Sequence, residues 1–213
     1  MGSDVTIDGP EPSAKVGRKF SQVIEGARQV FMTDGYEGAS VDDIARAAQV
    51  SKATIYSYFE NKEALFMRVA SDECLRQLKL ATDDIDRSAP VAQVLGVAAQ
   101  WLLGFFLSDF GQSIYRICVA ESTRFPELGR IYYETGPAHV RKELMDYLQE
   151  ASARGQLEIA PDELELAANQ FIELCRANLF HRRMFFVQLD FSADEIAAVR
   201  DGAVSTFLAR YSG

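Results

Sequence analysis

Residues 40–62 read SVDDIARAAQVSKATIYSYFENK, a segment that predicts two short helices joined by a tight turn. Ser40 stands where an N-cap is expected, and Asp43 follows three residues later. This spacing is close to a capping box, in which the hydroxyl satisfies a free amide and the acid favours the positive helix end. Ile44 and Ala48 then recur at helical spacing, which gives the first helix an apolar side.

The second helix is expected to begin at its own N-cap, Ser51, and to carry a narrow apolar edge made by Ile55 and Phe59. Asn61 can cap a further helix that starts at Lys62. Two short helices, a turn of a few residues and little apolar surface on the second helix predict a helix-turn-helix.

The face of the second helix opposite its apolar edge carries small or hydrogen-bonding side chains. Such a helix can enter a major groove, where its first residues meet base edges while hydroxyl and amine groups hold phosphates. An ordinary helical hairpin with a solvated face is the simpler alternative. We expect DNA contacts from Lys52, Thr54, Tyr56, Ser57 and Tyr58, and phosphate contacts from Ser40, Ser51 and Lys62.

A wider set of residues gives this segment a family resemblance. The set comprises Ile24, Ala27, Phe31, Gly35-Tyr36, Ile44-Ala45, Val50-Ser51, Thr54-Ile55-Tyr56, Tyr58-Phe59, Lys62 and Leu65. Residues 18–66 resemble the TetR family of bacterial transcription regulators. The resemblance implies that Lys52, Ala53 and Ser57 face bases, and that Tyr56, Tyr58 and Lys62 contact the DNA backbone.

Two residues depart from the family pattern. Gln49 stands in the turn where the family usually has Gly, which predicts a positive φ at a residue with a side chain. Gly26 lies inside the first helix where Ala is common, at a cost in helix propensity of up to about 1 kcal/mol.

The 213 residues have 48% hydrophobic content, which suits one or two compact domains, and a net charge of −9. The acidity is uneven. Residues 1–12 hold three acids and no Lys or Arg, residues 13–67 hold seven basic and seven acidic residues, and the remainder is acidic. We therefore expect a compact DNA contact with a few phosphates and an acidic body repelled from the duplex.

The remaining segments predict an all-α protein, because no stretch alternates with period two. We expect a disordered arm over 1–14, a helix-turn-helix DNA-binding domain over 15–66 and a helical ligand-binding and dimerisation domain over 67–213. The first helix is expected to run to about Thr33 and to end at Asp34-Gly35, and the fourth to run from Lys62 to about Asp86. Further helices are expected at 91–107, 110–123, 126–153, 162–187 and 193–210, with the helix over 126–153 either continuous or split at Gly136-Pro137.

The sequence gives little support to an enzyme. Its two histidines form no spaced set with Asp, Glu or Cys, no phosphate-binding glycine loop is present, and the three cysteines lie far apart. We expect no catalytic residue, no metal and no cofactor. The acidic first dozen residues do not resemble a signal peptide, and Val94–Leu107 is too short to span a bilayer. A cytoplasmic protein without membrane contact is expected.

The carboxy-terminal half is rich in aromatic residues. Most such rings are core, but rings with polar groups among them can also line a ligand cavity. The TetR resemblance implies such a cavity, and residues 121–137 resemble the AcrR/AefR-like branch. We expect a small apolar or aromatic effector near Trp101, Phe105, Tyr132 and Phe171.

The expected function is a regulator that binds double-stranded operator DNA as a homodimer through its last two helices. Apolar stripes on those helices are formed by Leu166, Phe171, Leu174, Ile196, Val199, Val204 and Phe207. The expected activity is repression, relieved by the effector. Two alternatives stay open: an activator or a regulator without an inducer, and a helical protein-interaction module that binds no DNA.

Overall fold

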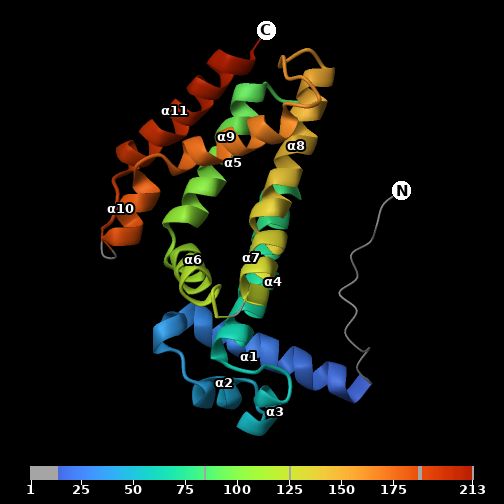
Figure 1. Cartoon of the computed structure of the whole chain (residues 1–213), viewed down its shortest axis with the longest axis vertical. Helices are drawn as coiled ribbons and strands as arrows, with labels where there is room; N and C mark the ends of the chain where they lie inside the picture. The colour runs from blue at the N-terminus through green and yellow to red at the C-terminus, as the bar shows by residue number, and fades with distance from the viewer. Residues whose placement is uncertain (1–13, 84, 125, 187–188, 213) are drawn as a thin grey trace. The chain divides into compact units, whose positions relative to one another are not determined.

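A computed structural model describes residues 14–83, 85–124, 126–186 and 189–212 (Figure 1). These residues form helices and connecting segments and contain no β-strand, as the all-α prediction requires. The arm predicted over 1–14 lies outside the described residues except for its last position. The chain divides into two compact units, of which the first ends at Val69 and the second begins at Ala70.

The first unit holds α1 (Ala14–Gly38), α2 (Val41–Ala47), α3 (Lys52–Tyr56) and the first turns of α4 (Lys62–Asp83). α1 is interrupted at the position where its end was predicted. Gly35 leaves helical geometry with φ 70° and ψ −179°, and the helix resumes after this kink and continues to Gly38. A residue with a side chain would be strained at that φ, so Gly35 allows the kink.

The caps predicted for this unit are confirmed. The Ser40 hydroxyl accepts the Asp43 amide at 3.1 Å, the Ser51 hydroxyl accepts the Thr54 amide at 3.1 Å, and the Asn61 side chain accepts the Ala64 amide at 2.7 Å. Each bond satisfies an amide that a helix start leaves without an internal partner.

The turn between α2 and α3 carries the predicted strain. Gln49 has φ 54°, the left-handed conformation expected where the family usually has Gly. After it, the Val50 amide donates to the Ala45 carbonyl at 3.0 Å, which closes the end of α2.

α1 packs closely on this turn at Gly26. A Cβ atom added to Gly26 would lie 2.5 Å from the Ala48 amide nitrogen and 2.7 Å from Ala48 Cα. The sequence treats this glycine as a cost in helix propensity, whereas the structure shows that it permits the close approach of α1 to the turn. Buried Ile44, Ile55 and Phe66 complete the core beneath it.

The second unit holds the rest of α4 and the helices that follow it along the chain. They are α5 (Val91–Leu107), α6 (Asp109–Glu121), α7 (Pro126–Thr135), α8 (Pro137–Ala153), α9 (Leu164–Arg176), α10 (Leu179–Phe185) and α11 (Ala193–Tyr211). Of the two alternatives for residues 126–153, the split is correct, with Gly136 between α7 and α8. α11 begins with the predicted capping box between Ser192 and Glu195.

The single helix predicted over 162–187 is wrong. The chain leaves helical geometry at Ala177, with φ −47° and ψ 121°, and at Asn178, with φ 61°, so that α9 and α10 are separate. Tertiary contacts hold the break: the buried Arg183 of α10 pairs with Asp109 and donates to the Leu107 carbonyl at 3.2 Å. Periodicity along the sequence carries no information about these contacts.

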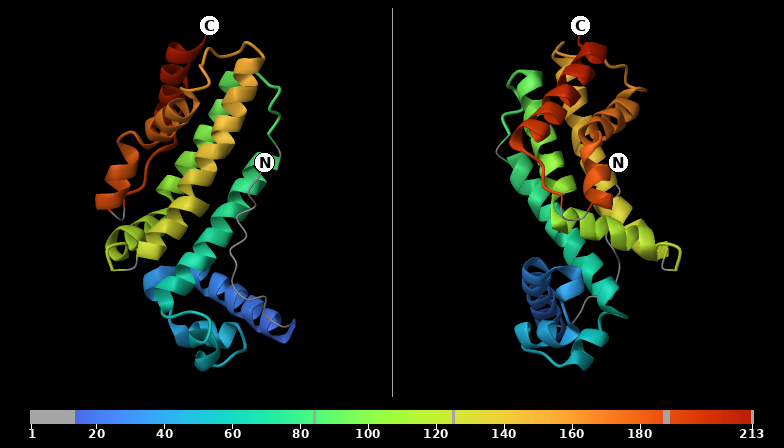
Figure 2. Two further views of the ribbon diagram at one scale, coloured as in Figure 1. Left: turned by 45° about the vertical axis from the view of Figure 1, so that its right-hand side comes forward. Right: turned by 90° about the vertical axis from the view of Figure 1, so that its left-hand side faces the viewer.

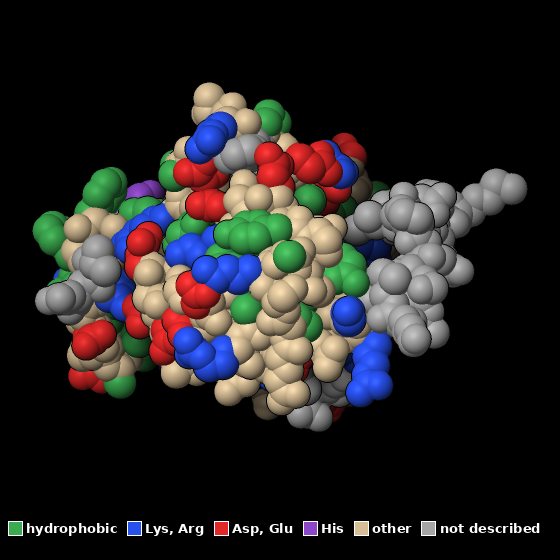
Figure 3. Space-filling model, turned by 90° about the horizontal axis from the view of Figure 1, so that it is seen from below, with side chains coloured by type: hydrophobic (Ala, Val, Ile, Leu, Met, Phe, Trp, Pro, Cys, Tyr) green, Lys and Arg blue, Asp and Glu red, His purple; other side chains and the backbone are tan. Residues whose placement is uncertain are grey.

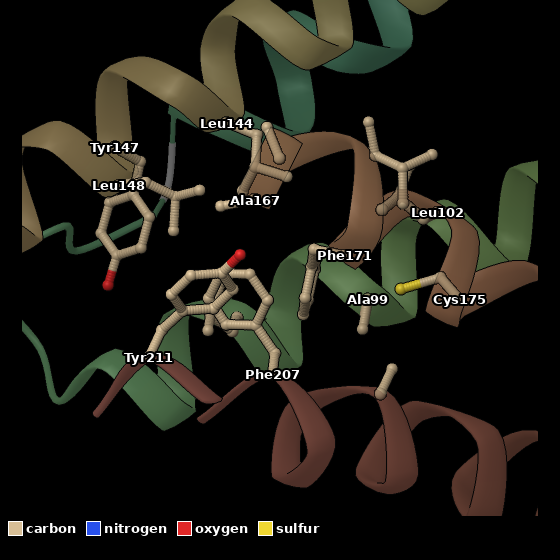
Figure 4. Close-up of a cluster of buried hydrophobic side chains, with 14 of the residues drawn as sticks. Ala99, Leu102, Leu144, Tyr147, Leu148, Ala167, Phe171, Cys175, Phe207 and Tyr211 are labelled. Atoms are coloured by element: carbon tan, nitrogen blue, oxygen red, sulfur yellow. The ribbon is translucent and has the colours of Figure 1, made fainter. Parts of the chain in front are cut away.

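The core of the second unit gathers around α9, which lies between α8 and α11 and packs against α5 (Figures 1 and 2). Figure 4 shows side chains from these helices meeting around Phe171. Phe171 is completely buried, and its ring centroid lies 5.3 Å from that of Phe207 in a T-shaped pair. Aromatic side chains in such pairs contribute much of the energy of a helical core.

No helix in the described part of the chain is both long and apolar enough to cross a membrane by itself. α5 and α6 together reach that length and composition, but they are bent by 64° at the break between them.

Candidate functional site

α3 presents most of its surface outward. Ile55 is buried, with 2% of its surface exposed, and holds the helix against the first unit. Lys52, Ala53, Tyr56 and Ser57 are exposed, with 53% of Tyr56 accessible. One apolar anchor and a largely exposed opposite face match the expectation for a helix that docks against another surface.

Lys52 has an ionic partner that the sequence did not suggest. Its ammonium lies 2.7 Å from a carboxylate oxygen of Asp42 in the first turn of α2, and both side chains are largely exposed. The hydrogen bond and the charge of Asp42 raise the pKa of Lys52, so the lysine stays protonated. The pair joins two helix starts that the turn brings together, a juxtaposition that helical spacing alone cannot predict.

Lys62 is placed differently from a free phosphate ligand. Its ammonium donates to the carbonyls of Tyr36 at 2.9 Å and Ala39 at 3.1 Å, and it lies 4.2 Å from the centre of the Tyr36 ring. The Tyr36 hydroxyl in turn donates to Glu63 at 2.7 Å. Lys62 therefore ties the end of α1 to the start of α4.

Other side chains predicted to contact DNA also make contacts within the protein. Ser40 and Ser51 use their hydroxyls as helix caps, and the Ser57 hydroxyl donates to the Thr54 carbonyl at 2.7 Å. Tyr58 is half-buried, and its ring packs edge-on against Phe20 with centroids 5.5 Å apart.

The charges near this face are mixed. Figure 3, which views the molecule from below, shows basic and acidic side chains interspersed with hydrophobic side chains and other surface, without a continuous basic patch. This pattern agrees with the balanced charge of residues 13–67. Non-specific attraction to DNA is weak on such a surface, so close geometric fit has to supply much of the affinity.

The second unit encloses a cavity of about 280 Å³. It is lined by Cys74 of α4, Trp101, Leu102, Phe105 and Phe106 of α5, Tyr115 of α6, Tyr132, Tyr133 and Thr135 of α7, Gly136, Pro137, Val140 and Arg141, and Asn169, Ile172, Glu173 and Arg176 of α9. Six of these side chains are aromatic, and Trp101 and Phe105 stack with an interplanar angle of 10°. The volume is near the lower end of the range for small-molecule sites, roughly 300–1,000 Å³.

Three of the four residues expected near an effector, Trp101, Phe105 and Tyr132, line this cavity together. Phe171 does not. It points into the core between α5 and α11, where Phe207 covers it (Figure 4). The sequence could not separate these roles because all four rings lie at helical spacing, and only the packing of α11 fixes the direction that Phe171 faces.

The sequence prediction of the effector site included Tyr132 but neither Arg176 nor Cys74, which also line the cavity. Arg176 lies over the rings of Phe106 and Phe180, with its guanidinium carbon 4.6 Å and 5.2 Å from their centres. Burial raises the pKa of the Tyr132 phenol, which therefore remains protonated at neutral pH. Burial also raises the pKa of the Cys74 thiol to about 12, so this cysteine is a poor nucleophile.

A smaller cavity of about 80 Å³ shares wall residues with the first. Trp101, Leu102 and Val140 line both cavities, while Tyr147 and Leu144 of α8 line only the smaller one. A movement of the Trp101 ring would therefore change the volume available on either side.

Models of known protein families match residues in both units. The model for the carboxy-terminal domain of AefR-like transcriptional repressors matches residues 93–213, more than half of the chain, and the model for bacterial regulatory proteins of the tetR family matches residues 23–69. The chain belongs to the TetR family. Its first unit is the helix-turn-helix DNA-binding domain of a TetR regulator, and its second is an AefR-like carboxy-terminal domain.

Solved structures agree over nearly the whole length. A TetR-family transcriptional regulator from Mesorhizobium loti is 26% identical, covers 94% of this chain and 100% of its own, and superposes with a TM-score of 0.75. A structure named flavonoid-responsive regulator FrrA is 35% identical and covers 92% of this chain and 98% of its own, with a TM-score of 0.67.

Among curated proteins, the transcriptional repressor AcnR of Corynebacterium glutamicum is 33% identical over 63 residues, or 30% of this chain. This chain spans about a third, 34%, of the length of AcnR. The two family models together identify the chain as a TetR-family DNA-binding transcription regulator.

Proposed function

We propose that this TetR regulator represses transcription by binding operator DNA as a homodimer, and that a small apolar or aromatic molecule releases it. The observation that carries the proposal is the 280 Å³ aromatic cavity in a chain whose other unit is a helix-turn-helix domain. Binding of the effector and binding of the operator are then alternative outcomes of one equilibrium.

On the DNA side, α3 is the recognition helix. Lys52, Ala53 and Ser57 face bases, and Thr54, Tyr56 and Tyr58 contact the backbone together with Ser40 and Ser51. Ala53 and Ser57 are small and exposed, so they fit shape readout or a thymine methyl group more than hydrogen-bond readout. The carbonyl contacts of Lys62 support an additional, indirect role, because they hold the start of α4 and the end of α1 in register.

On the effector side, the rings of Trp101, Phe105 and Tyr132 supply flat apolar surfaces that favour an aromatic ligand. A relative named as flavonoid-responsive, 35% identical to this chain, supports the same chemical class. The AefR-like repressor model over residues 93–213 supports repression rather than activation.

α4 supplies a covalent route between the two sites. The helix begins at Lys62 beside the recognition motif and carries Cys74 into the wall of the cavity. An effector that displaces this part of α4 acts on the same helix whose start Lys62 ties to the end of α1. The effector changes operator affinity only if it binds the DNA-incompetent arrangement more tightly.

For the dimer, the exposed faces of α9 and α11 are the proposed contact. Leu166 of α9 is 55% exposed, and Gly202 of α11 is exposed, with no other element of the described residues within 4 Å of an added Cβ. Phe171 and Phe207, which we expected on this contact, are buried within the chain and cannot contribute. Two-fold symmetry would place the recognition helices one turn of DNA apart, roughly 34–36 Å.

The decisive experiment selects an operator from fragmented genomic DNA and measures its affinity as apolar and aromatic compounds are added. Binding of each compound is followed in the same samples by the fluorescence of Trp101. Ala53→Glu places an acid on α3 and should abolish operator binding, whereas Ala153→Glu, an exposed change at the end of α8, should not. A ligand that lowers operator affinity must itself bind more weakly when operator is present.

Assembly is tested separately by light scattering at micromolar concentration. Truncation at Ser192 is unsuitable, because it removes Phe207 and Tyr211 from the core. Gly202→Arg should produce a monomer that binds the operator poorly, and Gly104→Arg, at an equally open glycine of α5, should remain a dimer. A wild-type monomer would refute the dimer.

A further inference from the structure

The wall of the large cavity contains a cation whose hydrogen-bonding capacity is only partly used. Among the described residues, no acceptor lies within hydrogen-bond distance of Arg176 Nε, although this atom is buried. Among the described residues, this side chain donates through Nη1 to a carboxylate oxygen of Glu173, at 2.9 Å. The edge of the guanidinium formed by Nε and Nη2 therefore has donors without acceptors.

The surroundings fix the plane of this guanidinium. It lies over Phe106 at 4.6 Å and over Phe180 at 5.2 Å, so two rings hold it in place. An arginine held in this way loses little side-chain freedom on pairing, and its planar fork matches the two oxygens of a carboxylate.

The other charged groups of the cavity wall do not compete for this edge. Glu173 is 64% exposed and engages the opposite side of Arg176 through Nη1. Arg141 is already paired with Glu165 at 3.5 Å and donates to the Tyr133 hydroxyl at 2.8 Å. Because Glu173 also lines the cavity, the wall carries two cations and one acid beside apolar rings, which leaves one positive charge in excess.

We propose that the effector is an aromatic acid whose carboxylate pairs with the Nε–Nη2 edge of Arg176, while its rings pack against Trp101 and Phe105. This inference rests on the proposed effector site and adds to it the class of ligand. The Tyr132 phenol also lines the cavity, and because its raised pKa keeps it protonated, it is available to donate to the same carboxylate. The neutral aromatic portion supplies burial, and the acid supplies selectivity.

A matched ligand pair tests the anchor. 2-Naphthoate is ionised at neutral pH, whereas 2-naphthamide has nearly the same shape and no charge. Both are titrated into the full-length chain while Trp101 fluorescence is recorded. The wild type should bind the acid about 10- to 100-fold more tightly than the amide, as expected for hydrogen bonds to a charged group.

Two variants separate a direct contact from a general charge effect. Arg176→Gln should reduce the preference for the acid to within about threefold, because acid binding weakens far more than amide binding, and continued binding of the amide shows that the cavity remains intact. Arg141→Gln removes a charge from the same wall and should retain the preference. Arg176→Lys keeps the charge without the fork and should retain an intermediate preference.

Equal affinity of the wild type for acid and amide overturns the anchor, as does an unchanged preference in Arg176→Gln. If the amide then still binds and releases the operator, the effector proposal stands without the anchor. If neither compound binds, the anchor is overturned, and the wider panel of compounds measured against the operator decides the effector proposal independently.

Discussion

Phe171 and Phe105 offer a direct test of the division between core and cavity. Phe171 is completely buried among α5, α9 and α11, whereas Phe105 is half-buried in the cavity wall. Truncating a buried Phe to Ala costs about 3–5 kcal/mol, and Leu keeps part of the lost contact. We therefore expect Phe171→Leu to lower the free energy of unfolding of the second unit by about 1–2 kcal/mol.

In a chain of this length, that loss corresponds to a decrease in melting temperature of about 2–8 °C. Trp101 is the one tryptophan of the sequence, so urea unfolding followed by its fluorescence reports on the second unit. 2-Naphthamide should bind Phe171→Leu as it binds the wild type. Phe105→Leu should show the reverse pattern, with a loss of less than about 1 kcal/mol in stability and a clear loss of ligand affinity.

Two results would refute this reasoning. If Phe171→Leu is as stable as the wild type, the ring is not a core residue. If both variants are fully folded and Phe171→Leu weakens ligand binding as much as Phe105→Leu does, Phe171 belongs to the effector site, as the sequence predicted.

Three further predictions concern single groups. Lys62→Met removes two charge-assisted hydrogen bonds to carbonyls and should lower the stability of the first unit by about 1 kcal/mol, as measured by thermal unfolding followed with circular dichroism. If the melting curve is unaltered and the salt slope of DNA binding falls by about one unit, Lys62 is instead a phosphate ligand. Asp42→Asn removes the acid beside Lys52 and should tighten operator binding at low salt, an effect that should fade at high salt. Weaker operator binding would mean instead that Asp42 positions Lys52 for contact with a base. Burial raises the pKa of Cys74, Cys118 and Cys175 to about 12, so at pH 8 only on the order of one thiol in ten thousand is ionised. The native protein should therefore react with a disulfide reagent far more slowly than the unfolded chain, at a rate that increases as the pH rises. Rapid labelling of the native protein at pH 8 would contradict this.

The sequence determined those features that depend on neighbouring residues. The caps at Ser40, Ser51 and Asn61 involve bonds three residues along the chain, so the residue types alone predict them. The positive φ of Gln49 was predicted from the family resemblance, because the family usually has Gly at this position of the turn. Family resemblance over residues 18–66 added the identity of the domain, because the residues that carry it pack the motif and present α3.

Only the tertiary structure decided the features that depend on distant residues. The break between α9 and α10 exists because Arg183 reaches Asp109 and Leu107, which lie more than seventy residues away. Phe171 belongs to the core because α11 covers it, and Arg176 enters the cavity wall because Phe106 and Phe180 hold it there. A helical stripe shows that a side chain is buried, whereas the element packed against that stripe decides whether it meets core, partner or ligand.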